Sequence, residues 1–112
     1  MNISSRASGS VQVVTVGEDV TQETVRDFTT FLDRLVDGGT AAVVLDLARV
    51  LYLTSRGLGA IISTYTVLRK RGGNLVLMQC QPEVRRLLEL TRLERILEVA
   101  QSEAEALAKL AR

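Results

Sequence analysis

Two adjacent hydroxyl residues, Thr54 and Ser55, stand where an apolar segment gives way to an amphipathic helix in the run Leu53–Gly59. The first turn of a helix carries N–H groups without partners and the positive end of the helix dipole. A phosphate on Ser55 would therefore be stabilised, as anions are at many helix N-termini. The run predicts a phosphorylation switch at Ser55, with Thr54 as a second candidate acceptor. The alternative is that Ser55 is an ordinary N-cap whose hydroxyl accepts from the N–H groups of residues 56–58.

The residue types that most catalytic sites need are missing from the chain. It has no histidine and one cysteine, which excludes Ser–His–Asp sets and Cys/His metal clusters. Gly57 and Gly59 belong to neither a P-loop nor a dinucleotide fingerprint, so we expect packing and backbone roles for them. Asp46 is expected to accept a hydrogen bond from nearby backbone. We therefore expect a binding or signalling module without a cofactor or metal. A nucleotide-hydrolysing enzyme that uses Ser55 or Asp46 is the least favoured alternative.

Length and composition indicate a single domain over residues 1–112. Hydrophobic residues make up 46% of the chain and charged residues 24%, as in folded globular proteins. The net charge of +1 gives no reason to expect nucleic acid as a partner. The polar first ten residues are unlike a signal peptide, and no apolar run approaches the ~20 residues that cross a bilayer. Cys80 cannot form a disulfide within the chain, and we expect it to be a small residue at the end of a strand. We also expect a cytoplasmic location and no membrane insertion.

Apolar periodicity divides the chain into alternating strands and helices. Apolar runs predict strands at residues 11–16, 41–47, 74–78 and 96–99, with a short antiparallel edge strand at 2–6. Helical spacing of apolar residues predicts helices at 21–36, 55–70, 82–91 and 102–112. We expect Thr21 and Ser102 to be N-caps, and Tyr52, Leu53 and Leu58 to lie partly in the core. The order predicts an α/β fold with a mixed, mainly parallel sheet of four to five strands and about four helices.

Four stretches of the chain match one known family in their order and spacing. They are Gly17-Glu18-Asp19, Val43–Leu47 through Tyr52-Leu53, Ser55–Gly59, and Gly72–Leu77 followed by Pro82–Leu93. Together they resemble the STAS domains, and in particular the anti-sigma factor antagonists of bacterial partner-switching systems. The resemblance covers residues 11–110 and implies the STAS fold.

The resemblance also implies a partner and a switch. In this family the pattern Asp-Ser-Ser/Thr-Gly-Leu-Gly carries the phosphoacceptor in its first serine, which by position is Ser55 here. Family members bind an anti-sigma factor that is also a serine kinase with a histidine-kinase-like ATP-binding fold. Phosphorylation blocks this complex, and a PP2C-type phosphatase restores it. The residues that the resemblance assigns to the partner interface are Asp19, Thr21, Tyr52, Thr54, Ser55, Arg56 and Gly57.

The chain departs from this family pattern at two positions beside the acceptor. Thr54 stands where the family has Asp, and Arg56 where it has Ser or Thr. Arg56 could pair with an added phosphate or clash with a kinase contact. The departures leave a second interpretation open, a non-phosphorylated STAS subunit that docks on the ATPase of a lipid-transport ABC system. We expect a monomer or a weak dimer paired through an N-terminal edge strand.

Overall fold

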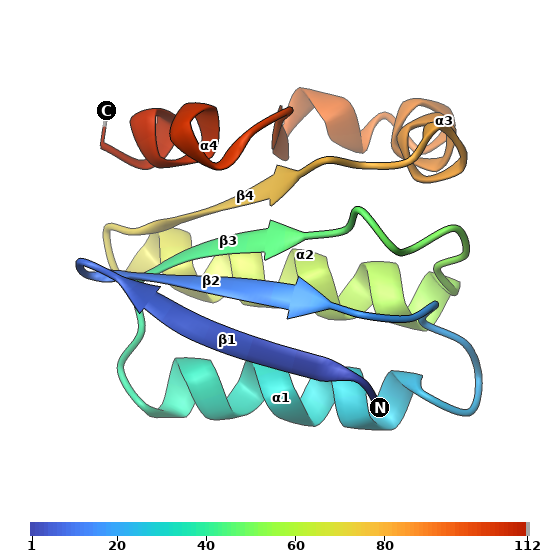
Figure 1. The fold of residues 1–112 in the computed structure, drawn as a ribbon, viewed down its shortest axis with the longest axis horizontal. Coiled ribbons are helices and arrows are strands. Elements are labelled where there is room, and N and C mark those ends of the chain that lie inside the picture. The colour runs from blue at the N-terminus through green and yellow to red at the C-terminus, as the bar shows by residue number, and fades with distance from the viewer. Residues whose placement is uncertain (112) are drawn as a thin grey trace.

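A five-stranded mixed sheet with helices on both faces makes up the computed structural model, which describes residues 1–111 (Figure 1). The strand order is β1-β2-β3-β4-β5; β1 runs antiparallel to β2, and the other neighbours are parallel. The elements are β1 (Ile3–Ser8), β2 (Val11–Val16), α1 (Val25–Asp37), β3 (Ala42–Asp46), α2 (Ser55–Lys70), β4 (Asn74–Met78), α3 (Pro82–Leu90), the 3₁₀ helix η1 (Leu93–Arg95), β5 (Glu98–Ala100) and α4 (Glu103–Leu110). The predicted fold class is confirmed, while the predicted helix end at Arg112 lies outside the described residues.

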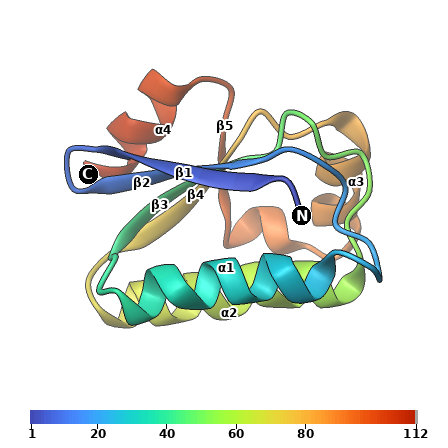
Figure 2. The ribbon, with the colours of Figure 1, turned by 60° about the horizontal axis from the view of Figure 1, so that its bottom comes forward.

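Alternating side chains of the strands divide the core into two layers. Leu75 and Leu77 of β4 belong to a cluster that also contains buried residues of α1, α2 and α3. Val76 and Met78 point to the other face, where they pack with Ala106 of α4. Figure 2 shows α1 and α2 side by side along one face of the sheet and α4 on the opposite face. This two-sided burial explains why the central strands read as continuous apolar runs.

The N-terminal hairpin confirms the predicted antiparallel edge strand and extends it to Ser8. Gly9 turns the chain between β1 and β2 with a φ of +61°, a conformation that glycine adopts without strain. The side chain of Arg6 pairs with Glu103 at the start of α4, which links the edge strand to the helix on the second face. The strand pairing itself sets the register, with Ile3 opposite Val16 at the carboxyl end of β2.

Helix α1 begins later than predicted, because residues 22–24 form a turn ahead of it. The Thr24 hydroxyl accepts from the Thr21 amide at 2.8 Å and donates to the Asp19 carbonyl at 2.9 Å. Thr24, and not Thr21, occupies the N-cap position, although no side-chain cap bond forms there. These bonds fold residues 19–24 into a compact loop after β2.

The last strand also begins later than predicted. Leu93–Arg95 form η1 after Arg92, whose φ of +61° turns the chain sharply. The predicted strand residue Ile96 therefore lies outside β5 and is 52% exposed. Ser102 caps α4 as predicted, since its hydroxyl accepts from the Glu105 amide at 3.1 Å.

Candidate functional site

A single parallel bridge joins the two loops that carry the predicted site. Val20, in the loop after β2, pairs with Leu53, in the loop after β3. The Val20 amide donates to the Tyr52 carbonyl and the Thr54 amide donates to the Val20 carbonyl, both at 3.0 Å. Because β2 and β3 are parallel, both loops leave the same edge of the sheet, at the start of α2 (Figure 1).

The Asp19 carboxylate contacts the backbone of the loop after β3. Its Oδ1 atom accepts from the Leu51 amide at 2.7 Å and from the Tyr52 amide at 3.2 Å. These bonds span more than thirty residues of sequence and fix the loop that leads into α2. Asp19 was expected at the partner interface, and in the structure its carboxylate is engaged with the backbone of its own chain.

Thr54 is the N-cap of α2. Its hydroxyl accepts from the Gly57 amide at 3.0 Å, and its carbonyl accepts from the Leu58 amide at 2.9 Å. The alternative that Ser55 is the N-cap is therefore wrong by one residue. A threonine hydroxyl serves as a helix cap in the same way as an aspartate carboxylate. Thr54 thus supplies the capping acceptor at the position where the family pattern has Asp.

Ser55 is the first residue of α2, and its side chain is exposed. Its hydroxyl makes no hydrogen bond with residues 1–111. The Thr54 hydroxyl, by contrast, is half-buried and engaged with Gly57. Of the two candidate acceptors, Ser55 is therefore the one whose oxygen is accessible and free of internal partners.

A shallow hollow of about 470 Å³ surrounds the Ser55 side chain. It is lined by residues of the two loops and the first turns of α1 and α2, namely Thr21, Gln22, Glu23, Val25, Tyr52, Thr54, Ser55 and Arg56. Five of the predicted interface residues thus meet on one surface, while Asp19 and Gly57 lie outside its lining. Gln22, Glu23 and Val25 were missed because only the turn ahead of α1 brings them toward α2.

Tyr52 was expected to lie partly in the core, and this prediction is wrong. Its side chain is 58% exposed, and that of its neighbour Leu51 is 53% exposed. Leu53 and Leu58, which carried the same expectation, are buried. The bridge between Val20 and Leu53 explains the difference, because it turns Leu53 inward and leaves the preceding side chains in solvent.

Gly57 and Gly59 differ in their surroundings. A Cβ atom built on Gly57 would lie 2.8 Å from Cγ1 of Val20 and 2.9 Å from Cδ1 of Leu53. A Cβ atom on Gly59 would meet nothing within 4 Å. Gly57 is therefore a packing position, as predicted, whereas Gly59 is not constrained by contacts.

The first turn of α2 carries no acidic residue and contains Arg56. The other three α-helices each have an acidic residue in the first turn: Asp27 in α1, Glu83 in α3, and Glu103 and Glu105 in α4. The Arg56 side chain is exposed and forms no ion pair with the residues that the structure describes. The site therefore combines a helix dipole and a cation on α2 with one carboxylate, that of Glu23, which comes from the turn ahead of α1.

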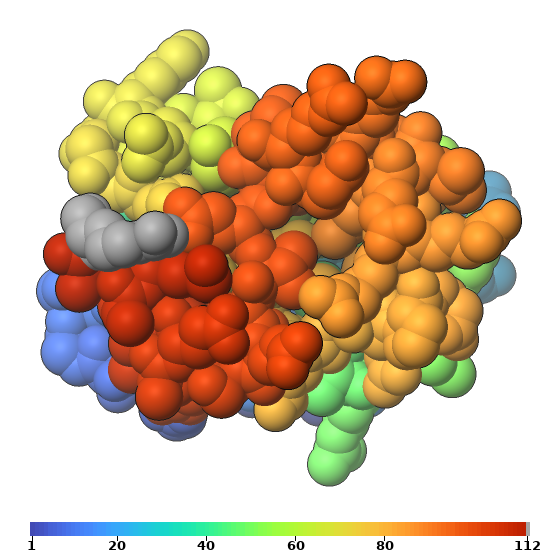
Figure 3. Space-filling model, turned by 90° about the horizontal axis from the view of Figure 1, so that it is seen from above, coloured from blue at the N-terminus to red at the C-terminus, as the bar shows by residue number. Residues whose placement is uncertain are grey.

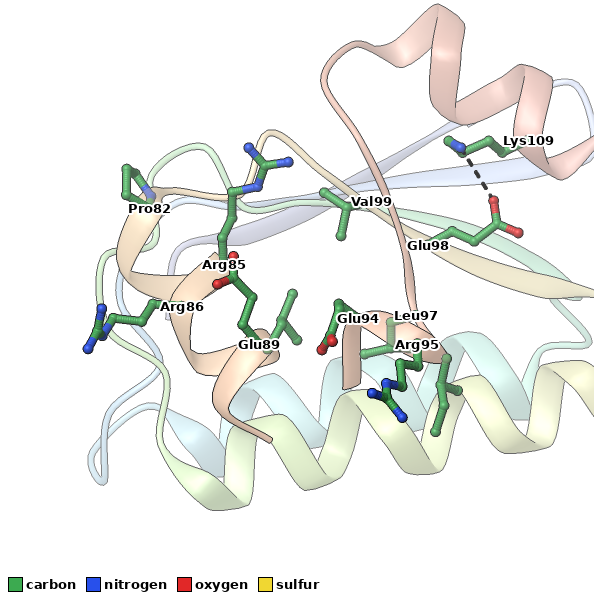
Figure 4. Close-up of a pocket in the computed structure, with 12 residues that line it drawn as sticks. Pro82, Arg85, Arg86, Glu89, Glu94, Arg95, Leu97, Glu98, Val99 and Lys109 are labelled. Carbon is green, nitrogen blue, oxygen red and sulfur yellow. Dashed lines mark ion pairs between the residues drawn. The ribbon is translucent and has the colours of Figure 1, made fainter. Parts of the chain in front are cut away.

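A second, larger hollow of about 900 Å³ lies along the β5 edge of the sheet. Figure 3 shows this face of the molecule hollowed between α3 and α4, and Figure 4 shows the side chains around it. Arginines and glutamates both line its walls, and Lys109 Nζ lies 3.6 Å from Glu98 Oε2. This hollow shares no lining residue with the one around Ser55.

Within residues 1–111, no group of three His, Cys, Asp or Glu side chains could hold a metal ion. No helix in that range is long and apolar enough to cross a bilayer.

Burial raises the pKa of the Cys80 thiol to about 11, against a smaller opposing effect of Arg85. The thiol just beyond β4 is therefore protonated at neutral pH, unlike a reactive cysteine. Asp46 accepts from the Ala48 amide at 3.0 Å, as expected.

Comparison with known proteins adds to this geometry. An anti-sigma F factor antagonist from Paenibacillus polymyxa is 32% identical over 68 residues, which are 61% of this chain and 58% of that protein. The chain thus matches somewhat more than half of that relative's length. A crystal structure of an anti-sigma factor antagonist from Mycobacterium paratuberculosis is similar with a TM-score of 0.87 and 25% identity, over 99% of this chain and 96% of that one. The Bacillus cell fate determinant SpoIIAA in its phosphorylated form has a TM-score of 0.75 at 15% identity, over 98% and 99% of the two chains.

The family model of the STAS domain matches residues 2–106, which include every strand of the sheet and both loops of the site. The fold, the order of the motifs and this match agree with one another. The chain belongs to the STAS domain family.

Proposed function

We propose that this chain is an anti-sigma factor antagonist of a cytoplasmic partner-switching pathway. In its unphosphorylated form it binds an anti-sigma factor that is a serine kinase with a histidine-kinase-like ATP-binding fold, and so frees a sigma factor. Phosphate on Ser55 blocks this complex, and a PP2C-type phosphatase restores it. Family membership and the anti-sigma factor antagonists among its relatives support the general role.

The observation that carries the proposal is the state of the Ser55 hydroxyl. It is exposed on the first residue of α2 and free of partners among residues 1–111, while the neighbouring Thr54 fulfils the capping role. A kinase can therefore modify Ser55 without removing a bond on which the helix depends. SpoIIAA, which has the same fold, has been solved in a phosphorylated form, so this fold is compatible with phosphorylation.

The electrostatics of α2 favour a modification that leaves the fold intact. A phosphoserine carries about −1.5 to −2 charges at neutral pH. The dipole of α2 and the Arg56 guanidinium both favour an anion at this helix end, and the first turn of α2 has no acidic residue. The Glu23 carboxylate, which lines the same hollow from the turn ahead of α1, opposes the anion. The same charge would have to be desolvated when a partner covers the hollow, which weakens the complex. The modification would thus change binding and leave folding nearly unchanged.

Binding to a purified serine kinase of this fold from the same organism tests the proposal. We compare the wild type with Ser55→Ala and Ser55→Asp by calorimetry. Ser55→Ala should bind like the wild type, and Ser55→Asp should bind at least about 100-fold more weakly, or roughly 2.7 kcal/mol.

Equal binding of wild type and Ser55→Asp would contradict the switch. Capture of the ATPase subunit of a lipid-transport ABC system, without any serine kinase, would contradict the proposed partner and favour the second interpretation.

A further inference from the structure

Two exposed apolar side chains stand next to each other in the loop that leads into α2. Among the described residues, four large apolar side chains are more than half exposed: Leu51 at 53%, Tyr52 at 58%, Leu90 at 71% and Ile96 at 52%. Single exposed apolar residues are common and need no explanation. Leu51 and Tyr52, however, are consecutive, and Tyr52 lines the hollow that contains Ser55. One pair of consecutive exposed apolar residues therefore borders the proposed site through Tyr52, whereas Ile96 lines the second hollow.

The backbone beneath these two side chains is held tightly. The amides of Leu51 and Tyr52 both donate to Asp19 Oδ1, and the Tyr52 carbonyl accepts from the Val20 amide. Three hydrogen bonds from a loop some thirty residues away thus fix an exposed segment that has no strand or helix of its own. An exposed apolar pair on a fixed backbone loses little conformational entropy on binding, as expected of a binding surface.

We infer that Leu51 and Tyr52 form the apolar anchor through which the partner docks, and that Asp19 is the positioning residue of this anchor. The inference rests on the proposed function, and the partner that binds this anchor is the serine kinase anti-sigma factor. The matching surface of that partner should be an apolar pocket beside the position that Ser55 occupies. Tyrosine is among the residues that most often dominate binding energy at interfaces.

The anchor also explains how a phosphate would prevent docking. Tyr52 and Ser55 line the same hollow, so a partner that covers the Tyr52 side chain also excludes water from Ser55. Removing a neutral hydroxyl group from water costs far less free energy than removing a dianion. The phosphate would therefore weaken the contact between the Tyr52 side chain and the partner, and the fold of this chain would not change.

Calorimetric binding of five variants to the purified serine kinase tests the anchor. Tyr52→Ala should weaken binding at least about 10-fold, as expected for a residue that dominates an interface, and Leu51→Ala should also weaken it. Ile96→Ala is the matched control, because Ile96 is nearly as exposed but lines the separate hollow. It should bind within about twofold of the wild type. The remaining two variants change Asp19, and circular dichroism checks that all five are folded.

The positioning role of Asp19 has a readout that needs no partner. Asp19→Ala removes the shared acceptor, so amide hydrogen exchange at Leu51 and Tyr52 should become faster and kinase binding weaker. Asp19→Asn keeps an acceptor oxygen and should restore most of the protection and most of the affinity. Unchanged exchange in Asp19→Ala would overturn the positioning role.

The outcomes separate this inference from the function on which it rests. If wild type binds the kinase and Ser55→Asp weakens binding, but Tyr52→Ala binds as tightly as wild type, the anchor is refuted and the proposed function stands. If wild type does not bind the kinase at all, both are refuted.

Discussion

Replacing Gly57 with alanine tests the packing that joins the two loops of the site. The added Cβ would lie 2.8 Å from Val20 Cγ1 and 2.9 Å from Leu53 Cδ1. Carbon atoms in contact prefer about 3.5–4.0 Å, so both neighbours must move by roughly 0.6 Å or more. Val20 and Leu53 are both buried and form the bridge between the loops, so neither can turn into solvent.

The magnitude follows from two opposing effects. Overpacking a buried position destabilises a protein by about 1–3 kcal/mol. Alanine is favoured over glycine in a helix by up to about 1 kcal/mol. We therefore expect Gly57→Ala to lower the free energy of unfolding by about 1–2 kcal/mol.

Gly59 provides the matched control in the same helix. It is exposed, and its Cβ would meet nothing within 4 Å, so Gly59→Ala should raise the free energy of unfolding by about 0.5–1 kcal/mol. Urea denaturation of the two variants and the wild type measures both values. The reasoning is refuted if Gly57→Ala is as stable as Gly59→Ala. Because the clash displaces the Val20–Leu53 bridge, Gly57→Ala should also weaken partner binding.

Three further predictions concern stability and ionisation. Thr54→Ala should destabilise the protein by about 1 kcal/mol in urea denaturation, whereas Thr54→Asp should retain most of the stability, because either Thr or Asp can cap α2; equal losses would contradict the capping role. Arg92→Gly should raise the free energy of unfolding by about 1 kcal/mol, because Arg92 has a left-handed φ of +61° that glycine adopts without strain; a less stable variant would contradict this. The pKa of Cys80 is raised to about 11, so stability should fall as the pH rises from about 9 to about 11, where the unfolded thiol ionises first. Cys80→Ser should lose this pH dependence, and identical pH profiles would exclude the thiol as its cause.

Local sequence patterns were enough to predict most of the fold. The residues of β2, α2 and β4 agree with the apolar runs and helical spacing from which they were predicted. The two elements that begin late were displaced by local polar bonds and turns. Thr24 is bonded to Asp19 and Thr21 ahead of α1, and Arg92 reverses the chain before η1. Both depend on backbone conformations that apolar periodicity does not report.

The site was only partly predictable because long-range contacts decide its surface. Thr54 and Ser55 are both good capping residues, so the sequence could not distinguish which one ends up as the cap. The exposure of Tyr52 depends on the bridge between Val20 and Leu53, which are more than thirty residues apart. The same holds for Asp19, whose bonding to the loop backbone could not be read from its position alone.

Phosphate transfer to Ser55 is the most direct test of the central claim. The chain is incubated with a purified serine kinase of the histidine-kinase-like fold from the same organism and ATP, and its intact mass is measured. Wild type and a Thr54→Val variant should each gain the mass of one phosphate, and Ser55→Ala should gain none. Phosphorylation of Ser55→Ala to the same extent as wild type, or no phosphorylation of wild type by any such kinase, would contradict the account.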